Sequence, residues 1–344
     1  MARKQLGRVV LLSIVLLSCL FGSWRLYDQR CRPVPIIQSL PAETDWLVFA
    51  SYMTPRCKLI VGQSVMSLYV IDLNNGELAH WAIDGQVASS LVDSWSPKRQ
   101  ELLITDYTGR GTQAQVVSRN GTTDRLPFLE GIASAYAWSP NGEQVAFSYR
   151  NQIYSQSVDG TDLSQVTHFA LDDGGTSPTH YVSAIHPSWS PDGEKLVFAL
   201  WTDDSATLYI VNRDGTGLQA LADHLPGKSR EPKWSPDGTK IAFLYSEEAD
   251  HPYTVWLMNP DGGEAKQLLE PHPSGDFARG VSSLAWAPDG RRLAFFSGWA
   301  GPCTWLFRES EICSQSLYLM DVDGTNLTKL THRVQYQSNL AWIY

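Results

Sequence analysis

Positive charge is scarce over most of this 344-residue chain. The sequence has 27 Lys and Arg against 36 Asp and Glu, and six of the basic residues lie within residues 1–32 together with one acidic residue. The remainder therefore has 21 basic and 35 acidic residues, a net charge of −14. A surface that binds nucleic acid must neutralise phosphates, and a body of this charge repels them. Nucleic-acid binding is therefore excluded.

Several catalytic and metal-binding motifs are also missing. The sequence has no G-x-S-x-G segment, in which α/β-hydrolases place a nucleophilic Ser, and no C-x-x-C pair of the kind that binds zinc. Residues 109–114 imitate a dinucleotide fingerprint, but the segment lies between two expected strands and has no helix to bind a pyrophosphate. These absences exclude a hydrolase-type peptidase and give no reason to expect a cofactor.

Only one long hydrophobic run occurs, at residues 9–24. Three basic residues precede the run and Arg25 follows it, a pattern that predicts an uncleaved signal anchor over residues 1–25. A cleaved signal peptide and a lipoprotein, in which Cys19 would be lipidated, remain as alternatives. Each of these places the rest of the chain outside the cytoplasm, at the periplasm or cell surface, after a linker at residues 26–43.

Five near copies of one short motif organise the rest of the chain. Each reads W-(S/A)-P-(D/N)-G or a degraded version of it, at residues 95–98, 138–142, 189–193, 234–238 and 286–290, and an apolar strand follows. Pro presets φ for the first corner of a tight turn, Asp or Asn suits the second corner, and Gly adopts a positive φ. Each motif, which we call a box, therefore predicts a β-hairpin turn.

A second repeated element, an alternating strand that ends in a Gly turn, occurs six times. Its strands lie at residues 68–72, 115–118, 153–154, 208–211, 255–258 and 317–320. Each unit then reads strand, turn, strand, loop, strand, turn, strand. The box Trp residues and Trp342 follow one another at intervals of 43 to 56 residues. These units predict an all-β fold, a six-bladed β-propeller of four-stranded blades, in which the repeated Trp side chains pack between blades.

The ends of the repeat region predict how the ring closes. Trp342 lies in a sixth inner strand with no box after it, and residues 47–51 align with the second strand at 293–297. We therefore expect the C-terminal strand to complete blade 1, which removes free sheet edges. An alternative reads residues 53–56 as the first box and leaves one strand spare.

The boxes, with the paired Tyr and Asp-Gly elements, resemble the repeat of the TolB propeller domain, a WD-like propeller repeat, over residues 44–344. The N-terminal α/β domain of TolB has no counterpart here. The resemblance implies a non-enzymatic, extracytoplasmic scaffold that binds a protein. It does not identify the partner, because one fold hosts many activities.

Long connections on one face of the predicted ring supply candidate binding residues. The Gly turns fall on one face, and the longest irregular segments, 169–185 and 298–315, fall on the other. Long loops on a rigid scaffold commonly carry binding, and aromatic and Arg side chains are favoured at hot spots. The candidates in or beside these segments are Trp299, Trp305, Phe307, Arg308, Asp172, Asp173, His180 and His186. Burial of the aromatic residues within their own loop is the alternative.

Histidine gives a second hypothesis for function. Seven of the eight His residues map to the loop face: His168, His180, His186, His224, His251, His272 and His332. Oligogalacturonate lyases, whose propellers the repeat also resembles, use His ligands. A propeller enzyme acting on a polysaccharide through a His-based metal site is therefore the alternative to the scaffold. No two-His spacing is diagnostic of a metal site, so we assign no metal and no catalytic residue.

Four cysteines lie beyond the apolar run: Cys31, Cys57, Cys303 and Cys313. Cys303 and Cys313 bracket the second long loop, and we predict that they form a disulfide. Pairing of Cys57 with either of them is the competing arrangement. We expect a monomeric propeller that contacts the membrane only through its N-terminal segment, with the loop face directed away from the membrane.

Overall fold

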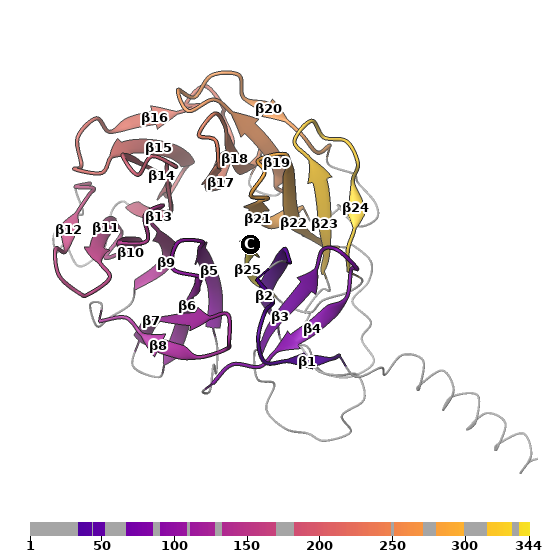
Figure 1. Cartoon of the computed structure of the whole chain (residues 1–344). Coiled ribbons are helices and arrows are strands. Elements are labelled where there is room, and N and C mark those ends of the chain that lie inside the picture. Colours follow the sequence, from indigo (N-terminus) through magenta and orange to yellow (C-terminus); the bar gives the residue numbers. More distant parts are fainter. Residues whose placement is uncertain are drawn as a thin grey trace, which may run out of the picture.

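The boxes form hairpin turns between antiparallel strands. The computed structural model describes residues 34–42, 44–51, 67–84, 90–108, 111–127, 133–169, 182–248, 251–270, 280–298, 315–331 and 337–344. Strands, turns, bends and irregular segments make up these residues, and the described segments contain no helix. The all-β propeller class predicted from the repeats is confirmed (Figure 1).

The strands pair in sequence order into four-stranded antiparallel runs. We name each run, or unit, by its innermost strand. The β5 unit contains β5 (Ser90–Ser96), β6 (Glu101–Thr108), β7 (Gly111–Ser118) and β8 (Thr123–Arg125). The β9 unit contains β9 (Ala133–Trp138), β10 (Gln144–Tyr149), β11 (Gln152–Ser157) and β12 (Ser164–Gln165). The β21 unit contains β21 (Val281–Trp286), β22 (Arg292–Gly298), β23 (Gln315–Asp321) and β24 (Thr328–Lys329).

Two further sheets depart from the expectation of separate four-stranded blades. One has eight strands: β13 (Val182–Trp189), β14 (Lys195–Thr202), β15 (Ala206–Asn212), β16 (Gln219–Leu221), β17 (Lys228–Trp234), β18 (Ile241–Ser246), β19 (Thr254–Met258) and β20 (Lys266–Gln267). Its β13 and β17 units are joined by one parallel pair, Ala206 with Lys228. The described residues therefore form five hydrogen-bonded sheets, not six separate ones. The connection arises because the start of β17 lies beside β15.

The fifth sheet, the β25 unit, combines strands from both ends of the chain. It contains β1 (Ile36–Ile37), β4 (Leu78–Trp81), β3 (Ser67–Asp72), β2 (Trp46–Ser51) and β25 (Gln337–Ile343), in that order. β25 pairs antiparallel with β2, with Leu47 opposite Trp342, as the alignment of residues 47–51 predicts. Each innermost strand contacts the next around the ring, and β25 contacts β5 (Figure 1).

Residues 34–42, which the sequence assigned to a linker, pack on the ring. β1 lies parallel to β4, and His80 N and Ala82 N donate to the carbonyl oxygens of Pro35 and Ile37 at 2.8 and 2.9 Å. Val34 packs against the cluster between the β21 and β25 units, and Leu40 is buried in the cluster between the β25 and β5 units. This segment, which we call the strap, therefore crosses the whole outer edge of the β25 unit.

The core lies in the seams between units. One cluster, for example, joins Leu103 and Val116 of the β5 unit to Trp138, Val145 and Phe147 of the β9 unit. Of the box Trp residues, Trp95, Trp138 and Trp189 are buried, and Trp234 and Trp286 are partly buried and pack against clusters. The predicted role of these Trp side chains in packing between units is therefore observed.

Some sequence predictions fall outside the described residues. These are the anchor at residues 1–25, the alternative box at 53–56 and the Cys303–Cys313 disulfide. Within the part of the chain that the structure describes, no helix has the length and apolar character needed to cross a membrane.

Candidate binding site on the inner strands

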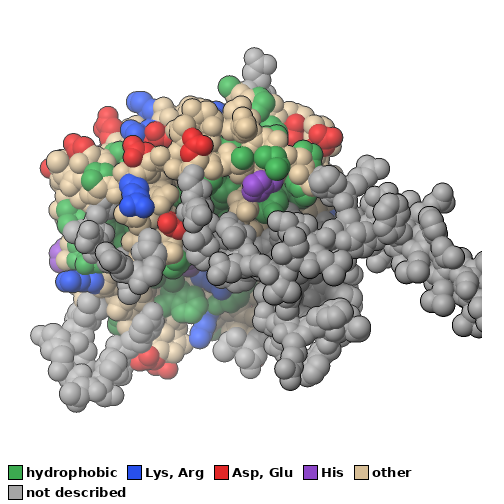
Figure 2. All heavy atoms as spheres, turned by 90° about the horizontal axis from the view of Figure 1, so that it is seen from below, with side chains coloured by type: hydrophobic (Ala, Val, Ile, Leu, Met, Phe, Trp, Pro, Cys, Tyr) green, Lys and Arg blue, Asp and Glu red, His purple; other side chains and the backbone are tan. Residues whose placement is uncertain are grey.

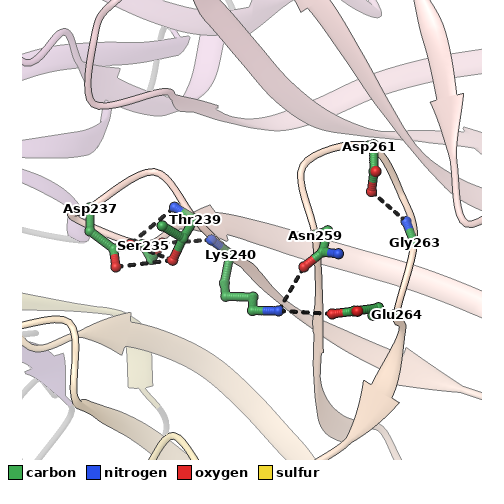
Figure 3. Close-up of polar contacts among 8 residues, drawn as sticks. All are labelled: Ser235, Asp237, Thr239, Lys240, Asn259, Asp261, Gly263 and Glu264. Carbon is green, nitrogen blue, oxygen red and sulfur yellow. Dashed lines mark hydrogen bonds and ion pairs between the residues drawn. The ribbon is translucent and has the colours of Figure 1, made fainter.

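A buried serine and an aspartate hold the boxes at 189–193 and 234–238 in their turn conformation. In the box at 234–238, Ser235 Oγ donates to Asp237 Oδ1 at 2.6 Å, and Lys240 N donates to Ser235 Oγ at 2.9 Å (Figure 3). Thr239 N also donates to Asp237 Oδ1 at 3.0 Å. The hydrogen bond from Ser235 is the main reason that the pKa of Asp237 lies below its ordinary value. Ser235 and Asp237 thus serve the turn itself.

The second turn is tied to the box turn of the same unit. Lys240 Nζ donates to Asn259 Oδ1 at 2.6 Å and forms an ion pair with Glu264 Oε2 at 3.3 Å (Figure 3). Asp261 Oδ1 accepts a hydrogen bond from Gly263 N at 2.9 Å. In Figure 2, Asp and Glu side chains gather along the upper rim of the ring, with a few Lys and Arg among them. Because acidic residues such as Asp237 and Asp261 close turns, the number of acidic side chains on the surface does not indicate a ligand site.

The glycine of the second turn contacts the neighbouring unit. Gly121 has φ of 82°, and a Cβ there would lie 2.6 Å from the carbonyl oxygen of Ala82. Equivalent glycines face backbone of the preceding unit at 2.8 to 2.9 Å: Gly160, Gly215, Gly262 and Gly324. Gly76, in the β25 unit, has nothing within 4 Å of the same position. Five of these six glycines are therefore needed for packing as well as for positive φ.

Each innermost strand carries a β-bulge close to its Trp. The bulge lies three residues before the Trp, except in β5, where it lies two residues before Trp95. Four residues at that position have positive φ: Ala135 (55°), His186 (56°), Glu231 (50°) and Ser283 (52°). The pairing with the second strand shifts register at the same places. A bulge leaves an unpaired residue and redirects its side chain, so these positions are specialised in an otherwise regular ladder.

A bulge affects the backbone N–H of the residue that follows it. In some units a side chain of a neighbouring inner strand accepts a hydrogen bond from this N–H, and in others a proline at this position has no N–H group. Tyr136 N in β9 donates to Asp93 Oδ1 in β5 at 3.1 Å, and Leu340 N in β25 donates to Ser283 Oγ in β21 at 2.8 Å. The corresponding residues of β13 and β17 are Pro187 and Pro232, which have no N–H group. Proline is therefore tolerated in these strands because no donor is needed there.

Asp93 is a buried carboxyl between the β5 and β9 units. Its Oδ2 accepts a hydrogen bond from Thr105 Oγ1 at 2.7 Å, in addition to the bond from Tyr136 N. Burial raises the pKa of Asp93 to about 7, although both hydrogen bonds and the charge of Lys233 act in the opposite direction. Asp93 therefore changes its protonation state near neutral pH.

Lys233, Glu231 and His186 extend this cluster to the β13 and β17 units. Burial lowers the pKa of Lys233, against the favourable charges of Glu231 and Asp93. Burial also lowers the pKa of His186, Glu231 opposes the shift, and Lys233 and Arg230 add to it. Because β5 and β17 face each other across the centre of the ring in Figure 1, the interaction of Asp93 with Lys233 spans the axis.

Two buried polar atoms of the same region have no partner among the described residues. They are His186 Nδ1 and Arg230 Nε. The Arg230 guanidinium lies over the Tyr253 ring, 3.8 Å from the ring centroid to Cζ, and its Nη2 donates to Val281 O at 3.5 Å. Unpaired buried polar atoms are costly, so a polar ligand or water at the axis would lower the free energy of this site.

The cluster includes only one residue that the sequence singled out, His186. The other candidates, Trp299, Trp305, Phe307, Arg308, Asp172, Asp173 and His180, lie outside the described residues, so their role stays a prediction. Of the loop-face histidines, His168, His224 and His251 are described and exposed. The described residues contain no group of three His, Cys, Asp or Glu side chains that could hold a metal ion.

Sequence reasoning missed Asp93, Glu231 and Lys233. Each lies one to three residues before a box Trp, where the other units have Ser, Ala, Val, Tyr, Leu, Pro, Asn or His. Charged residues at positions that are mostly apolar or small in sister repeats were the available signal, since a charge is rarely buried without function or partner.

The fold and the inner-strand cluster define a β-propeller with a polar axis. Part of the chain is similar to a known family: the family described as TolB beta propeller domain matches residues 176–295. The resemblance inferred from the boxes is therefore confirmed.

Similar proteins extend this match. A protein TolB homolog of Chlorobium luteolum is 26% identical over 227 residues, 64% of this chain and 45% of that protein. The chain thus matches less than half the length of this relative. TolB of Acinetobacter baumannii superposes with a TM-score of 0.61 at 16% identity, over 89% of this chain and 68% of that one. A putative TolB of Agrobacterium tumefaciens gives 0.59 at 18% identity, over 85% and 90%. At these identities, the two structures show the fold alone.

Proposed function

We propose that this chain is an extracytoplasmic propeller scaffold that binds a protein partner without catalysis and is held at a membrane by residues 1–25. The observation that carries the binding proposal is the axial cluster, which combines two unpartnered polar atoms with titratable side chains from β5, β13 and β17 whose charges act on one another. The match to TolB propellers supports a scaffold.

The proposal includes a ring of six blades. The eight-stranded sheet consists of two four-stranded antiparallel runs linked by a single residue pair, a much weaker connection than the ladders within each run. Each run has its own box, second turn and innermost strand, as do the β5, β9 and β21 units. Counting each run as one blade gives six, with β25 as the inner strand of the first.

The axial cluster suits a polar segment of the partner. Lys233 and Arg230 are donors, Glu231 and Asp93 supply carboxyl groups, and His186 can donate or accept. A chain segment has both donors and acceptors in its backbone, so it can pair with all of these groups. The loop residues Trp305 and Arg308 are proposed as a second part of the binding surface.

The test begins with capture of the partner from native membranes by the full chain, followed by purification of that partner and titration with variants. Lys233→Met and His186→Asn change the axis, and Asn tolerates the positive φ at this position. Lys240→Met, in the turn of Figure 3, is the matched control for Lys233→Met because it removes a half-exposed Lys from the same unit. We expect at least a tenfold loss of affinity for the axial variants and less than twofold for the control.

Loop variants locate the second part of the surface. If Trp305→Ala and Arg308→Ala weaken binding while the axial variants do not, the partner binds the loop face alone and the axial proposal is wrong. Equal affinity for all variants would refute both surfaces. Turnover of a polysaccharide, together with stoichiometric bound metal, would refute the non-enzymatic scaffold.

A further inference from the structure

The strap determines where the N-terminal part of the chain reaches the ring. Val34 is the first described residue and packs at the seam between the β21 and β25 units. From there the chain runs along β4 as β1 and ends at Leu40, in the seam between the β25 and β5 units. β1 lies at the periphery of the ring in Figure 1, on neither the box turns nor the axis.

We propose that the outer rim of the β25 unit, formed by the strap and β4, is the surface that lies against the membrane. The proposal rests on the membrane attachment in the proposed function, and the bilayer that holds residues 9–24 is the single occupant of this surface. This proposal differs from the expectation that the Gly-turn face lies towards the membrane and the loop face points away from the membrane.

The length of chain before the strap restricts the distance to the bilayer. Arg25 and Val34 are nine residues apart, which allows about 30 Å when fully extended and about 17 Å as a relaxed chain. The far rim of the ring is more distant than the relaxed length. The path from β1 to the far rim crosses the β25 unit, with four spacings between neighbouring strands, and then an opposite four-stranded unit, with three. Seven spacings of about 4.7 Å already amount to about 33 Å. The rim that carries β1 is therefore nearer the membrane on average than the opposite rim.

The described part of this rim carries no charge that would attract anionic lipid. The described residues of the strap and the β25 unit before β5 contain four acidic residues and no Lys or Arg: Asp45, Asp72, Glu77 and Asp84. Anionic lipid would repel this rim weakly. Its exposed apolar side chain is Ile36, which is 69% exposed. Proximity is therefore expected to follow from the tether and to be insensitive to salt.

Photo-crosslinking of the full chain tests this orientation. Benzoylphenylalanine replaces Ile36 in one variant and Leu163 or Leu218 in the others, and the protein is reconstituted into phosphatidylcholine vesicles. Leu163 and Leu218 are also exposed, at 42% and 44%, beside β12 and β16 on the far side of the ring (Figure 1). We expect at least fivefold more lipid adduct at position 36, measured by mass spectrometry, and the same ratio at 50 mM and 500 mM NaCl.

A lengthened tether is the matched control. Twenty Gly and Ser residues inserted between Pro33 and Val34 should reduce the ratio to less than twofold, because the ring can then rotate freely. Equal adducts at the three positions without the insertion would refute the orientation while leaving the attachment intact. Recovery of the protein in the soluble fraction after alkaline carbonate extraction would refute both. Adducts that disappear at high salt would show electrostatic docking and also overturn the proposal.

Discussion

Two neighbouring seams of the ring are closed by different means. Between the β25 and β5 units, residues near the two chain ends form the hydrogen bonds across the seam. Leu40 N donates to Arg119 O at 2.8 Å, and Arg119 Nη1 donates to Pro41 O at 2.7 Å. Gln100 Nε2 reaches the carbonyl oxygen of Tyr344 at 3.5 Å. Between the β5 and β9 units, side chains of the inner strand β5 form the hydrogen bonds across the seam. Asp93 accepts from Tyr136 N, and Ser94 Oγ accepts from Trp138 N at 3.0 Å.

The difference shows that closure of the ring places an additional demand on the sequence. A seam within the continuous repeat needs only one short polar side chain opposite the donor that a bulge leaves unpaired. The seam beside the chain ends has to hold two ends that nothing covalent connects, and it recruits Arg119, whose guanidinium also lies over the Trp95 ring. Changes at the chain-end seam should therefore affect the whole ring, and changes at the β5–β9 seam should be local.

The largest effect is expected from removing the inner strand of the β25 unit. Deletion of residues 335–344 exposes β2 and removes Leu340, Trp342 and Ile343 from the core. Each buried side chain of this kind contributes about 1.5–3 kcal/mol, so the loss is comparable to the total stability of a domain. We expect no cooperative thermal transition, measured by calorimetry. Melting at the full-length temperature would show that the ring does not depend on this strand, and deletion of Tyr344 alone is the control.

A smaller effect should distinguish a glycine at the chain-end seam from one with open space. Gly121→Ala places a Cβ 2.6 Å from Ala82 O and 3.1 Å from Gln38 O of the strap. Gly76→Ala meets no atom within 4 Å, and both positions have positive φ. We expect a loss of about 3 kcal/mol for Gly121→Ala, from strain and overpacking, and about 1 kcal/mol for Gly76→Ala. Equal losses in urea unfolding would mean that the contact between units adds nothing.

Asp93 makes the β5–β9 seam dependent on pH. Its folded-state pKa of about 7 lies above the ordinary value, so the native state binds the proton more tightly than the unfolded state. Stability from this group is therefore complete below about pH 4 and falls by about 1.4 kcal/mol per pH unit up to about pH 7. Asp93→Asn lacks this dependence. The difference between the two stability curves therefore reports Asp93 together with its charge interaction with Lys233.

We expect the Asn variant to become more stable relative to the wild type as pH rises from 5 to 7, in urea unfolding at constant ionic strength. Parallel curves would contradict a buried, protonated Asp93. The transition should stay cooperative in both proteins, because this seam does not close the ring.

The smallest effect tests the strap. Leu40 is 4% exposed, so Leu40→Ala should cost about 2 kcal/mol. Ile36→Ala in the same segment removes a side chain that remains mostly in solvent and should change the free energy of unfolding by less than about 0.5 kcal/mol. If both variants behave like wild type, the strap is not part of the folded ring and the membrane-facing rim would lose its attachment point.

Much of the fold was predictable because its signals are local. A box such as 234–238 contains a Pro, an Asp and a Gly whose backbone preferences specify a turn, and the flanking apolar residues alternate as strands do. The strand that pairs with β2 was also predictable, because residues 339–343 repeat the pattern of the other inner strands. The strap was not predictable, since Ile36 and Ile37 are only a short apolar pair between prolines.

By itself, the sequence determined the repeat, its turns, the propeller class and the excess of acidic residues. Tertiary structure decided which residues form the candidate site, because Asp93 and Lys233 are 140 positions apart and interact only after opposite units have closed around one axis. It also decided that Gly121 must lack a side chain for packing, since the atom that Cβ would meet belongs to another unit. Local backbone preference acts within a few residues, whereas burial and charge interaction depend on distances that the closed ring alone establishes.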